Sequence, residues 1–278
     1  FGGSLLMDDV SIDNLSGKDW ADKIISELRE MPNVIVKNRS QVFGYYDHNM
    51  MVMVERTKDH IENPSKYTPR QKLWYIRAKE VILSTGSLER PLVFGNNDRP
   101  GIMLASAAKE YLKTYGVAVG KKPVIFTNND TAYELAIEFK KNGIDPLVID
   151  VRANLESLVI NEAKNLKIKI KFSSAIANAK GYRRVNSVVI GKLNKEKTEY
   201  ESLETVFCDC ICVSGNWTPT IHLSSQSGNK LKFDDKIDAF VPDKSKQNEN
   251  SIGASNGTFT LKETLKSSFK IGSEVSKK

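Results

Sequence analysis

The sequence predicts an α/β fold in which buried strands alternate with helices and end in small side chains. Residues 81–83 form a short apolar run, as a buried strand would, and the run stops at Ser84-Thr85-Gly86. Small residues at the end of a sheet strand let a backbone or a bound ligand come close. A second strand–helix–strand pattern occupies residues 122–151. With 278 residues, the chain can build one large domain or two of ordinary size.

The N-terminal part predicts one amphipathic helix followed by several strands. Ser16 or Asp19 can cap this helix, and Pro32-Asn33 ends it. Its apolar face is formed by Trp20, Ile24, Ile25 and Leu28. Strands are then expected over residues 34–36, 50–54 and 73–83, with a bend at Gly44, a polar loop over residues 59–71 and a helix over residues 103–115.

The unit at residues 122–151 keeps the strand–helix–strand pattern but lacks a phosphate-binding loop. Such a loop reads G-x-G-x-x-G or G-x-G-x-x-A, because bare backbone must approach a pyrophosphate at the helix N-terminus. Here residues 127–132 read TNNDTA, and Asp130 adds a negative charge. We therefore predict that this unit has lost nucleotide binding and that Asp150, at the ribose position, is a remnant. The residues of its helix that should face inward are Ala132, Leu135, Ala136 and Phe139.

The second half predicts a meander and a further small-residue turn. A helix over residues 155–166 and a strand over 168–172 precede a three-strand meander over 174–200, with turns at Gly181 and Gly191-Lys192. A strand over residues 203–213 follows, and SIGASNG at residues 251–257 forms a turn before a helix over 258–270. Cys208, Cys210 and Cys212 alternate and would share one face of a strand. Without a C-x-x-C motif, they are interpreted as buried thiols in a reducing cytoplasm.

Composition and spacing argue against several classes of site. The net charge is +7, but lysines are scattered over residues 164–171, 192–197 and 263–278, which favours a solvated surface over a nucleic-acid partner. No apolar run approaches the roughly 20 residues that span a bilayer, so no membrane partner is expected. No signal peptide is recognised at the N-terminus. The histidines at 48, 60 and 222 lie far apart in sequence, and neither a metal site nor catalytic residues are predicted.

Two long strings resemble the alpha subunit of heterotetrameric sarcosine oxidases. Residues 82–130 contain ERPLVF, NDRPG and FTNND, and residues 213–235 read VSGNWTPTIHLSSQSGNKLKFDD. A strand ending in S-T-G is also typical of the glutathione-reductase-like, Rossmann-like fold with two dinucleotide-binding domains. The resemblance implies that fold with a β-meander, truncated at its N-terminus. Residues 1–117 and 204–278 would form the first domain, incomplete, and residues 118–203 an inserted second domain.

The resemblance also implies a nucleotide site made by three small-residue turns. They would converge on the C-terminal edge of one parallel sheet. No Asp follows Gly253, which favours NAD over a flavin at this site. The implied contacts are Gly2, Gly3, Ser4, Val42, Ser84, Thr85, Gly86, Gly253, Ala254 and Asn256.

For the whole protein, the resemblance implies oxidative demethylation of sarcosine to glycine, with formation of peroxide and methylene-tetrahydrofolate. This subunit would bind NAD. FAD and FMN would belong to, or be shared with, a partner subunit, and tetrahydrofolate would bind a C-terminal domain beyond Lys278. The implied partners are beta, gamma and delta subunits and a small amine substrate, and this chain alone is expected to be inactive.

Two alternatives remain open. One is a non-catalytic scaffold that docks a flavoprotein amine or opine dehydrogenase subunit. The other is a self-sufficient NAD(P)H-dependent flavin reductase, which would need a working phosphate loop after Phe126 and either a redox cysteine pair or a quinone site.

Overall fold

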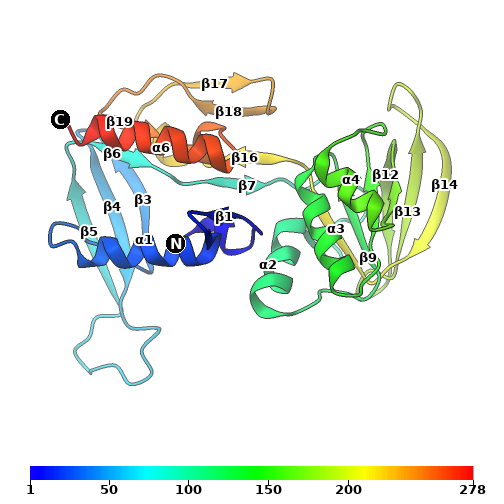
Figure 1. The fold of residues 1–278 in the computed structure, drawn as a ribbon, viewed down its shortest axis with the longest axis horizontal. Coiled ribbons are helices and arrows are strands. Elements are labelled where there is room, and N and C mark those ends of the chain that lie inside the picture. Colours follow the sequence, from blue (N-terminus) through cyan, green and yellow to red (C-terminus); the bar gives the residue numbers. More distant parts are fainter. Residues whose placement is uncertain (278) are drawn as a thin grey trace. The chain divides into compact units, whose positions relative to one another are not determined.

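The computed structural model describes residues 1–277, which form two compact units (Figure 1). Unit 1 contains Phe1–Ile24 and Glu89–Asn216, and unit 2 contains Ile25–Leu88 and the residues from Trp217 onward. Both bounds of the predicted inserted domain, residues 118 and 203, lie inside unit 1, which extends further at either end. The chain passes between the units three times, first within α1 (Gly17–Glu30) and then at β7 (Ser87–Glu89) and β16 (Trp217–Pro219). The last two strands pair with each other.

A five-stranded parallel sheet forms the centre of unit 1. Its strands run in the order β11-β10-β9-β15-β8, and each neighbouring pair is parallel. They are β8 (Ile102–Leu104), β9 (Pro123–Thr127), β10 (Leu147–Asp150), β11 (Lys169–Lys171) and β15 (Cys210–Ser214). Every residue of β9 and β15 is buried, because layers pack on both faces of this sheet.

Helices cover one face of the parallel sheet and a meander covers the other (Figure 1). The helices are α2 (Ala105–Tyr115), α3 (Thr131–Lys141) and α4 (Leu158–Asn165), and the meander consists of β12 (Ser174–Lys180), β13 (Ser187–Leu193) and β14 (Tyr200–Phe207). Ile125 packs with the helices, whereas its neighbours Val124 and Phe126 pack with the meander. The α3 residues predicted to face inward are all buried, as expected from their spacing.

The first residues of the chain belong to unit 1. They form η1 (Gly3–Leu6), β1 (Ser11–Ile12), β2 (Leu15–Ser16) and the start of α1 (Gly17–Glu30). Ser16 Oγ accepts a hydrogen bond from the Asp19 N–H at 3.1 Å, which confirms Ser16 as the helix cap. Lys109 of α2 attaches this segment through an ion pair with Asp8 at 2.7 Å.

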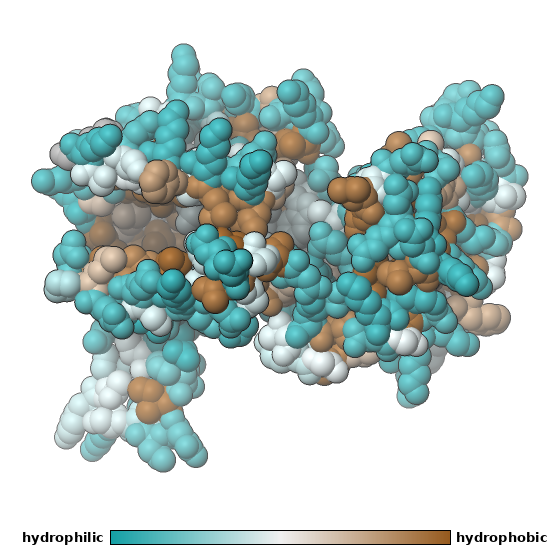
Figure 2. Space-filling model, in the orientation of Figure 1, coloured by the Kyte–Doolittle hydropathy of each residue, from teal (hydrophilic) through white to brown (hydrophobic). Residues whose placement is uncertain are grey.

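Unit 2 contains an antiparallel sheet and several strand pairs. The sheet is β3 (Ser40–Tyr46), β4 (Met50–Arg56) and β5 (Gln71–Arg77), and the loop between β4 and β5 has a largely hydrophilic surface (Figure 2). β6 (Val81–Leu83) pairs in parallel with β19 (Glu249–Ser251), and Tyr45, Val81 and Leu83 form a small core. The remaining elements are α5 (His222–Gln226), β17 (Leu231–Asp234), β18 (Ala239–Pro242), η2 (Gly253–Asn256) and α6 (Leu261–Val275).

Three predicted elements of the first half were wrong in type or extent. The single strand predicted over residues 73–83 is two strands, β5 and β6, in two different sheets. Residues 34–36 form no strand, and β3 begins only at Ser40. Side chains attach this segment instead, because Lys37 Nζ lies 3.2 Å from the Glu55 carboxylate and 4.3 Å from the centre of the Trp74 ring. The helix predicted over residues 103–115 begins at Ala105, because the residues before it pair with β15 as β8.

The single strand predicted over residues 203–213 is two strands in two different sheets. The chain leaves β14 after Phe207 and enters β15 at Cys210. Asp209 fixes the break, since its carboxylate accepts hydrogen bonds from the N–H groups of Lys121 and Lys122 at 2.7 and 2.8 Å. Cys208 therefore packs with the meander core, whereas Cys210 and Cys212 pack with the helices. The thiols are buried as predicted, but they do not share one face.

The meander turn predicted at Gly191-Lys192 was also wrong, because both residues lie inside β13. Glycine is needed there for another reason: a Cβ on Gly191 would lie 2.1 Å from the ring of Tyr200 on β14. The turn itself follows at residues 194–199, where Asn194 Oδ1 accepts a hydrogen bond from the Thr198 N–H at 2.9 Å.

Candidate functional site

Two of the predicted nucleotide-facing turns lie side by side in unit 2. β6 and β19 are neighbouring parallel strands, and Leu83 lies opposite Ser251. Ser84-Thr85-Gly86 and η2 (Gly253–Asn256) therefore leave the same edge of this strand pair. Ligands of parallel α/β sheets bind at this edge, beyond the carboxyl ends of the strands.

Hydrogen bonds hold the two turns in place. The Leu83 carbonyl accepts from the Ile252 N–H at 2.9 Å and from Ser255 Oγ at 3.2 Å. Thr85 Oγ1 donates to the Thr220 carbonyl at 2.7 Å. Ser255 is buried and serves the turn itself, whereas the side chain of Asn256 is exposed and available for a ligand.

The glycines of the two turns have different roles. Gly86 has a φ of +74°, and a Cβ placed there would meet no atom within 4 Å. Gly253 has a φ of +66°, and a Cβ there would lie 3.2 Å from Thr264 Cγ2 of α6. Gly253 thus lets α6 pack. The Gly86 carbonyl accepts a hydrogen bond from the Thr220 N–H at 2.9 Å, and the space beside its Cα is open, which fits the close approach of a dinucleotide.

The other predicted contacts lie elsewhere. Gly2 precedes η1, which contains Gly3 and Ser4, and this segment belongs to unit 1. Val42 lies in β3, in a different sheet from β6 and β19, beside a bulge between Val42 and Gly44. The structure brings together the Ser84 and Gly253 turns within unit 2, and the roles of Gly2, Gly3, Ser4 and Val42 remain predictions.

The first turn of α6 is less suited to a phosphate. Thr260 Oγ1 accepts a hydrogen bond from the Glu263 N–H at 3.4 Å and donates to the Glu263 carboxylate at 2.6 Å. This arrangement satisfies the helix terminus and places a negative charge beside it. A ligand at this edge would therefore rely on the two turns more than on the helix.

In unit 1, side chains fill the loop that would hold a pyrophosphate. Asn129 Nδ2 donates to the Ser214 carbonyl at 3.2 Å and to Ser214 Oγ at 3.0 Å. Asn129 Oδ1 accepts from the Thr131 N–H at 3.1 Å and from Thr131 Oγ1 at 2.6 Å. The amide thus ties the end of β15 to the start of α3, across the position where such a loop needs bare backbone.

The ribose position of unit 1 is satisfied internally as well. Asp150 is fully buried and accepts from Tyr133 Oη at 2.8 Å and from Arg152 Nη2 at 2.8 Å. Arg152 also pairs with Asp130 at 2.8 Å. Burial, reinforced by the Asp150 charge, raises the pKa of Tyr133, so its hydroxyl remains a donor. Sequence reasoning missed Arg152, although its place two residues after Asp150 could have suggested this pair.

All three thiols are buried, which limits their access to reagents. Burial raises the pKa of the Cys208 thiol to about 12, so the reactive thiolate is scarce. Residues 1–277 contain no group of three or more acidic, histidine or cysteine side chains placed to hold a metal ion. In the same residues, every helix is too short or too polar to cross a bilayer.

Comparisons of sequence give two groups of relatives. The sarcosine oxidase alpha subunit of Corynebacterium sp. (strain P-1) is 36% identical over 279 residues, and that of Rhizobium meliloti (strain 1021) is 37% identical over 241 residues. These matches cover 98% and 86% of this chain but only 28% and 23% of the relatives, so the chain spans about a quarter of their length. One opine oxidase subunit, from Agrobacterium tumefaciens (strain Ach5), is 22% identical and is matched over 46% of its length and 80% of this chain. No family model matches.

Comparisons of structure identify the fold. Thioredoxin reductase from T. acidophilum superimposes with a TM-score of 0.67 at 14% identity, covering 95% of this chain and 82% of the enzyme. L-proline dehydrogenase from P. horikoshii gives a TM-score of 0.60 at 19% identity, with 91% of this chain and 43% of that chain covered. The predicted glutathione-reductase-like, Rossmann-like fold with a meander is therefore confirmed. From its sequence, the chain belongs to the family of the sarcosine oxidase alpha subunits.

Proposed function

We propose that this chain is the dinucleotide-binding part of a sarcosine oxidase alpha subunit, with NAD at the edge formed by β6 and β19. One observation supports this site more than any other. The neighbouring parallel strands β6 and β19 are each followed by a turn of small residues. In the turn after β6, a Cβ added at Gly86 would meet no atom within 4 Å. The absence of an acidic residue after Gly253 favours NAD over a flavin, as the sequence predicts.

The residues have distinct parts in this proposal. The backbone of Ser84-Thr85-Gly86 approaches the ligand, the turn at Gly253 and Ala254 closes the other side, and Asn256 supplies an amide for hydrogen bonding. Contacts of the nucleotide with Gly2, Gly3, Ser4 and Val42 remain predictions from the sequence. Bound NAD would supply a hydride acceptor or donor, and this chain's residues bind and orient it.

The second nucleotide position, which lies in unit 1, stabilises the fold and binds no nucleotide in this proposal. Asn129 and the Asp150–Arg152 pair use up the donors and acceptors that a nucleotide would need. These internal contacts favour a scaffold role for unit 1. The alternative of a non-catalytic docking scaffold is therefore supported for unit 1 but not for unit 2. A self-sufficient flavin reductase is disfavoured, because the phosphate loop is filled and the three thiols are buried.

For the whole protein, we propose oxidative demethylation of sarcosine to glycine in a complex with beta, gamma and delta subunits. FAD and FMN belong to a partner subunit or are shared with it, and tetrahydrofolate binds a separate domain of the full-length protein. The names of the curated relatives support the complex, since each is called a subunit.

The test is co-purification of the full-length protein with its partners, followed by analysis of the nucleotides released on denaturation. We expect NAD together with sarcosine-dependent peroxide formation. Gly86→Ala should reduce bound NAD at least tenfold. Gly116→Ala is the matched control, because Gly116 ends α2 with a φ of +64° and also has no atom within 4 Å of an added Cβ.

The outcomes distinguish failure of the proposed NAD site from failure of the proposed function. Equal NAD content in the two glycine variants would show that the β6–β19 edge is the wrong site. A full-length complex with neither NAD nor sarcosine-dependent peroxide would refute the function itself.

A further inference from the structure

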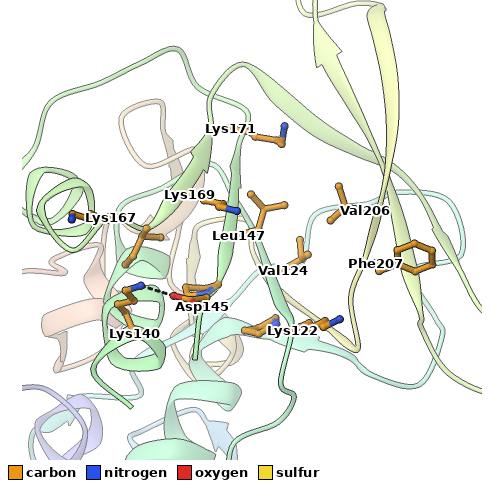
Figure 3. A pocket seen from close by; sticks show the side chains of 13 residues that line it. Lys122, Val124, Lys140, Asp145, Leu147, Lys167, Lys169, Lys171, Val206 and Phe207 are labelled. Carbon is orange, nitrogen blue, oxygen red and sulfur yellow. Dashed lines mark hydrogen bonds and ion pairs between the residues drawn. The ribbon is translucent and has the colours of Figure 1, made fainter. Parts of the chain in front are cut away.

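A basic cleft of about 630 Å³ opens in unit 1 at the edge of the parallel sheet opposite the Asn129 loop (Figure 3). Its lining residues include the starts of β9, β10 and β11, and the end of β14 forms another part of the wall. The apolar part of the lining includes Val124, Leu147 and Val206. None of these residues belongs to the proposed NAD site.

Five lysines surround this cleft, although they are far apart in the sequence. Lys122 precedes β9, Lys140 lies at the end of α3 and Lys167 lies in the turn after α4. Lys169 and Lys171 belong to β11. The fold gathers them because parallel strands start at the same edge of a sheet. A scattered distribution along the chain therefore becomes a concentrated positive surface.

Intramolecular partners neutralise only part of this charge. Lys140 pairs with Asp145, and Lys171 pairs with Glu204 at 2.6 Å. Within residues 1–277, no carboxylate lies within ion-pair distance of Lys122, Lys167 or Lys169. Lys140, and to a smaller extent the charge of Lys169, lowers the pKa of Asp145 in the same lining. Three cations at one cleft thus lack an ion-pair partner in this part of the chain.

Apolar surface and free strand edges accompany the charge. Phe207 lines the cleft with 77% of its surface exposed. β11 and β14 are each the last strand of their sheets among the described residues, so both carry backbone groups without a neighbouring strand on one side. Such edges pair readily with an extended polypeptide.

We propose that this cleft docks an extended acidic segment of another polypeptide. Its carboxylates face Lys122, Lys167 and Lys169, and an apolar side chain covers Phe207. A small polyanion fits less well, because the described lining contains no arginine and the lysines are flexible point charges. Nucleic acid is disfavoured because Phe207 is the one aromatic residue in that lining, whereas single strands bind to series of stacking rings. The inference rests on the proposed function only for the source of the partner, a subunit of the same complex.

The first test measures binding of a fluorescein-labelled twelve-residue peptide made of Asp and Glu with two central Leu residues. We expect the triple variant K122E/K167E/K169E to bind it at least tenfold more weakly. The control triple K180E/K195E/K197E, which changes exposed lysines at the meander turns by the same charge, should lose less than threefold. Binding should also weaken in 0.5 M salt, where the Debye length falls to a few ångström.

The second test uses the full-length complex and a zero-length carbodiimide, which joins lysine amines to carboxylates in direct contact. We expect cross-links from Lys122, Lys167 or Lys169 to an acidic residue of another subunit. Their absence in an assembled complex would overturn the inference. So would equal losses in the two triple variants, or displacement of the peptide by pyrophosphate at micromolar concentration, which would indicate a small-anion site. The peptide arm needs neither NAD nor sarcosine turnover, so its failure is separable from failure of the proposed function.

Discussion

Replacing Asn129 by alanine tests whether its side chain holds the filled loop of unit 1 together. The variant removes two hydrogen bonds to Ser214, two from Thr131 and one to Asn128. At a net value of about 1 kcal/mol for each of the five bonds, the upper limit is about 5 kcal/mol. Water can replace the bonds to Thr131 because Asn129 is half-buried. Ser214 is fully buried, and although its carbonyl keeps the Asn128 N–H at 3.3 Å, its hydroxyl loses the Asn129 side chain. We therefore expect a local loss of about 2–3 kcal/mol.

Hydrogen exchange followed by mass spectrometry measures this loss in unit 1 alone. Peptides from β9 and α3 should exchange about 30–100-fold faster in the Asn129→Ala variant, since each 1.4 kcal/mol corresponds to a factor of ten. Asn128→Ala is the matched control. It removes a single side-chain bond, to Asn129 at 3.2 Å, and should accelerate exchange less than fivefold. Rates within a factor of three of each other in the two variants would refute the role assigned to Asn129.

Three further predictions concern stability and thiol chemistry. Asp150→Asn should lower the free energy of unfolding in urea by about 3 kcal/mol, because it leaves Arg152 with one carboxylate partner. Asp130→Asn, which changes a more exposed carboxylate, should lower it by less than about 1 kcal/mol. Equal losses in the two variants would contradict the importance of the buried pair. Burial raises the pKa of Tyr45 to about 12, so its contribution to the stability of the folded state is complete below its ordinary pKa of about 10 and is lost as the pH rises toward 12. Tyr45→Phe should therefore reduce the fall of the urea unfolding midpoint between about pH 10 and about pH 12. An equally steep fall in the variant would exclude Tyr45 as the cause. Native protein at pH 8 should react with dithionitrobenzoate at none of its three thiols within minutes and at all three in urea, and a fast native reaction would show that Cys208 is accessible.

The elements that local patterns specify could be predicted from the sequence. The inward residues of α3, the Ser16 cap and the small-residue turn after β6 follow from spacing, capping chemistry and side-chain size. The loss of glycines at residues 127–132 also indicated that this loop does not hold a phosphate. These features depend on neighbours in the sequence, so no tertiary information was needed.

The features that the sequence did not reveal depend on long-range contacts. Asp209 ends β14 because it binds backbone groups more than 80 residues away, at Lys121 and Lys122. Gly191 looked like a turn residue, but it accommodates a ring from the next strand. The lysines were interpreted as a dispersed solvated surface, and only the common starting edge of the parallel strands brings five of them to one cleft.

The pairing of β6 with β19 also fixes an order of events during synthesis. Val81–Leu83 leaves the ribosome early, but its partner strand Glu249–Ser251 follows only after all of Glu89–Asn216 has been made. Unit 1 can therefore fold while the nascent chain is still growing, and unit 2 must wait with Val81 and Leu83 unpaired. Until translation passes residue 251, those strand edges are open to wrong partners, which makes this interval the period when the protein most needs a chaperone.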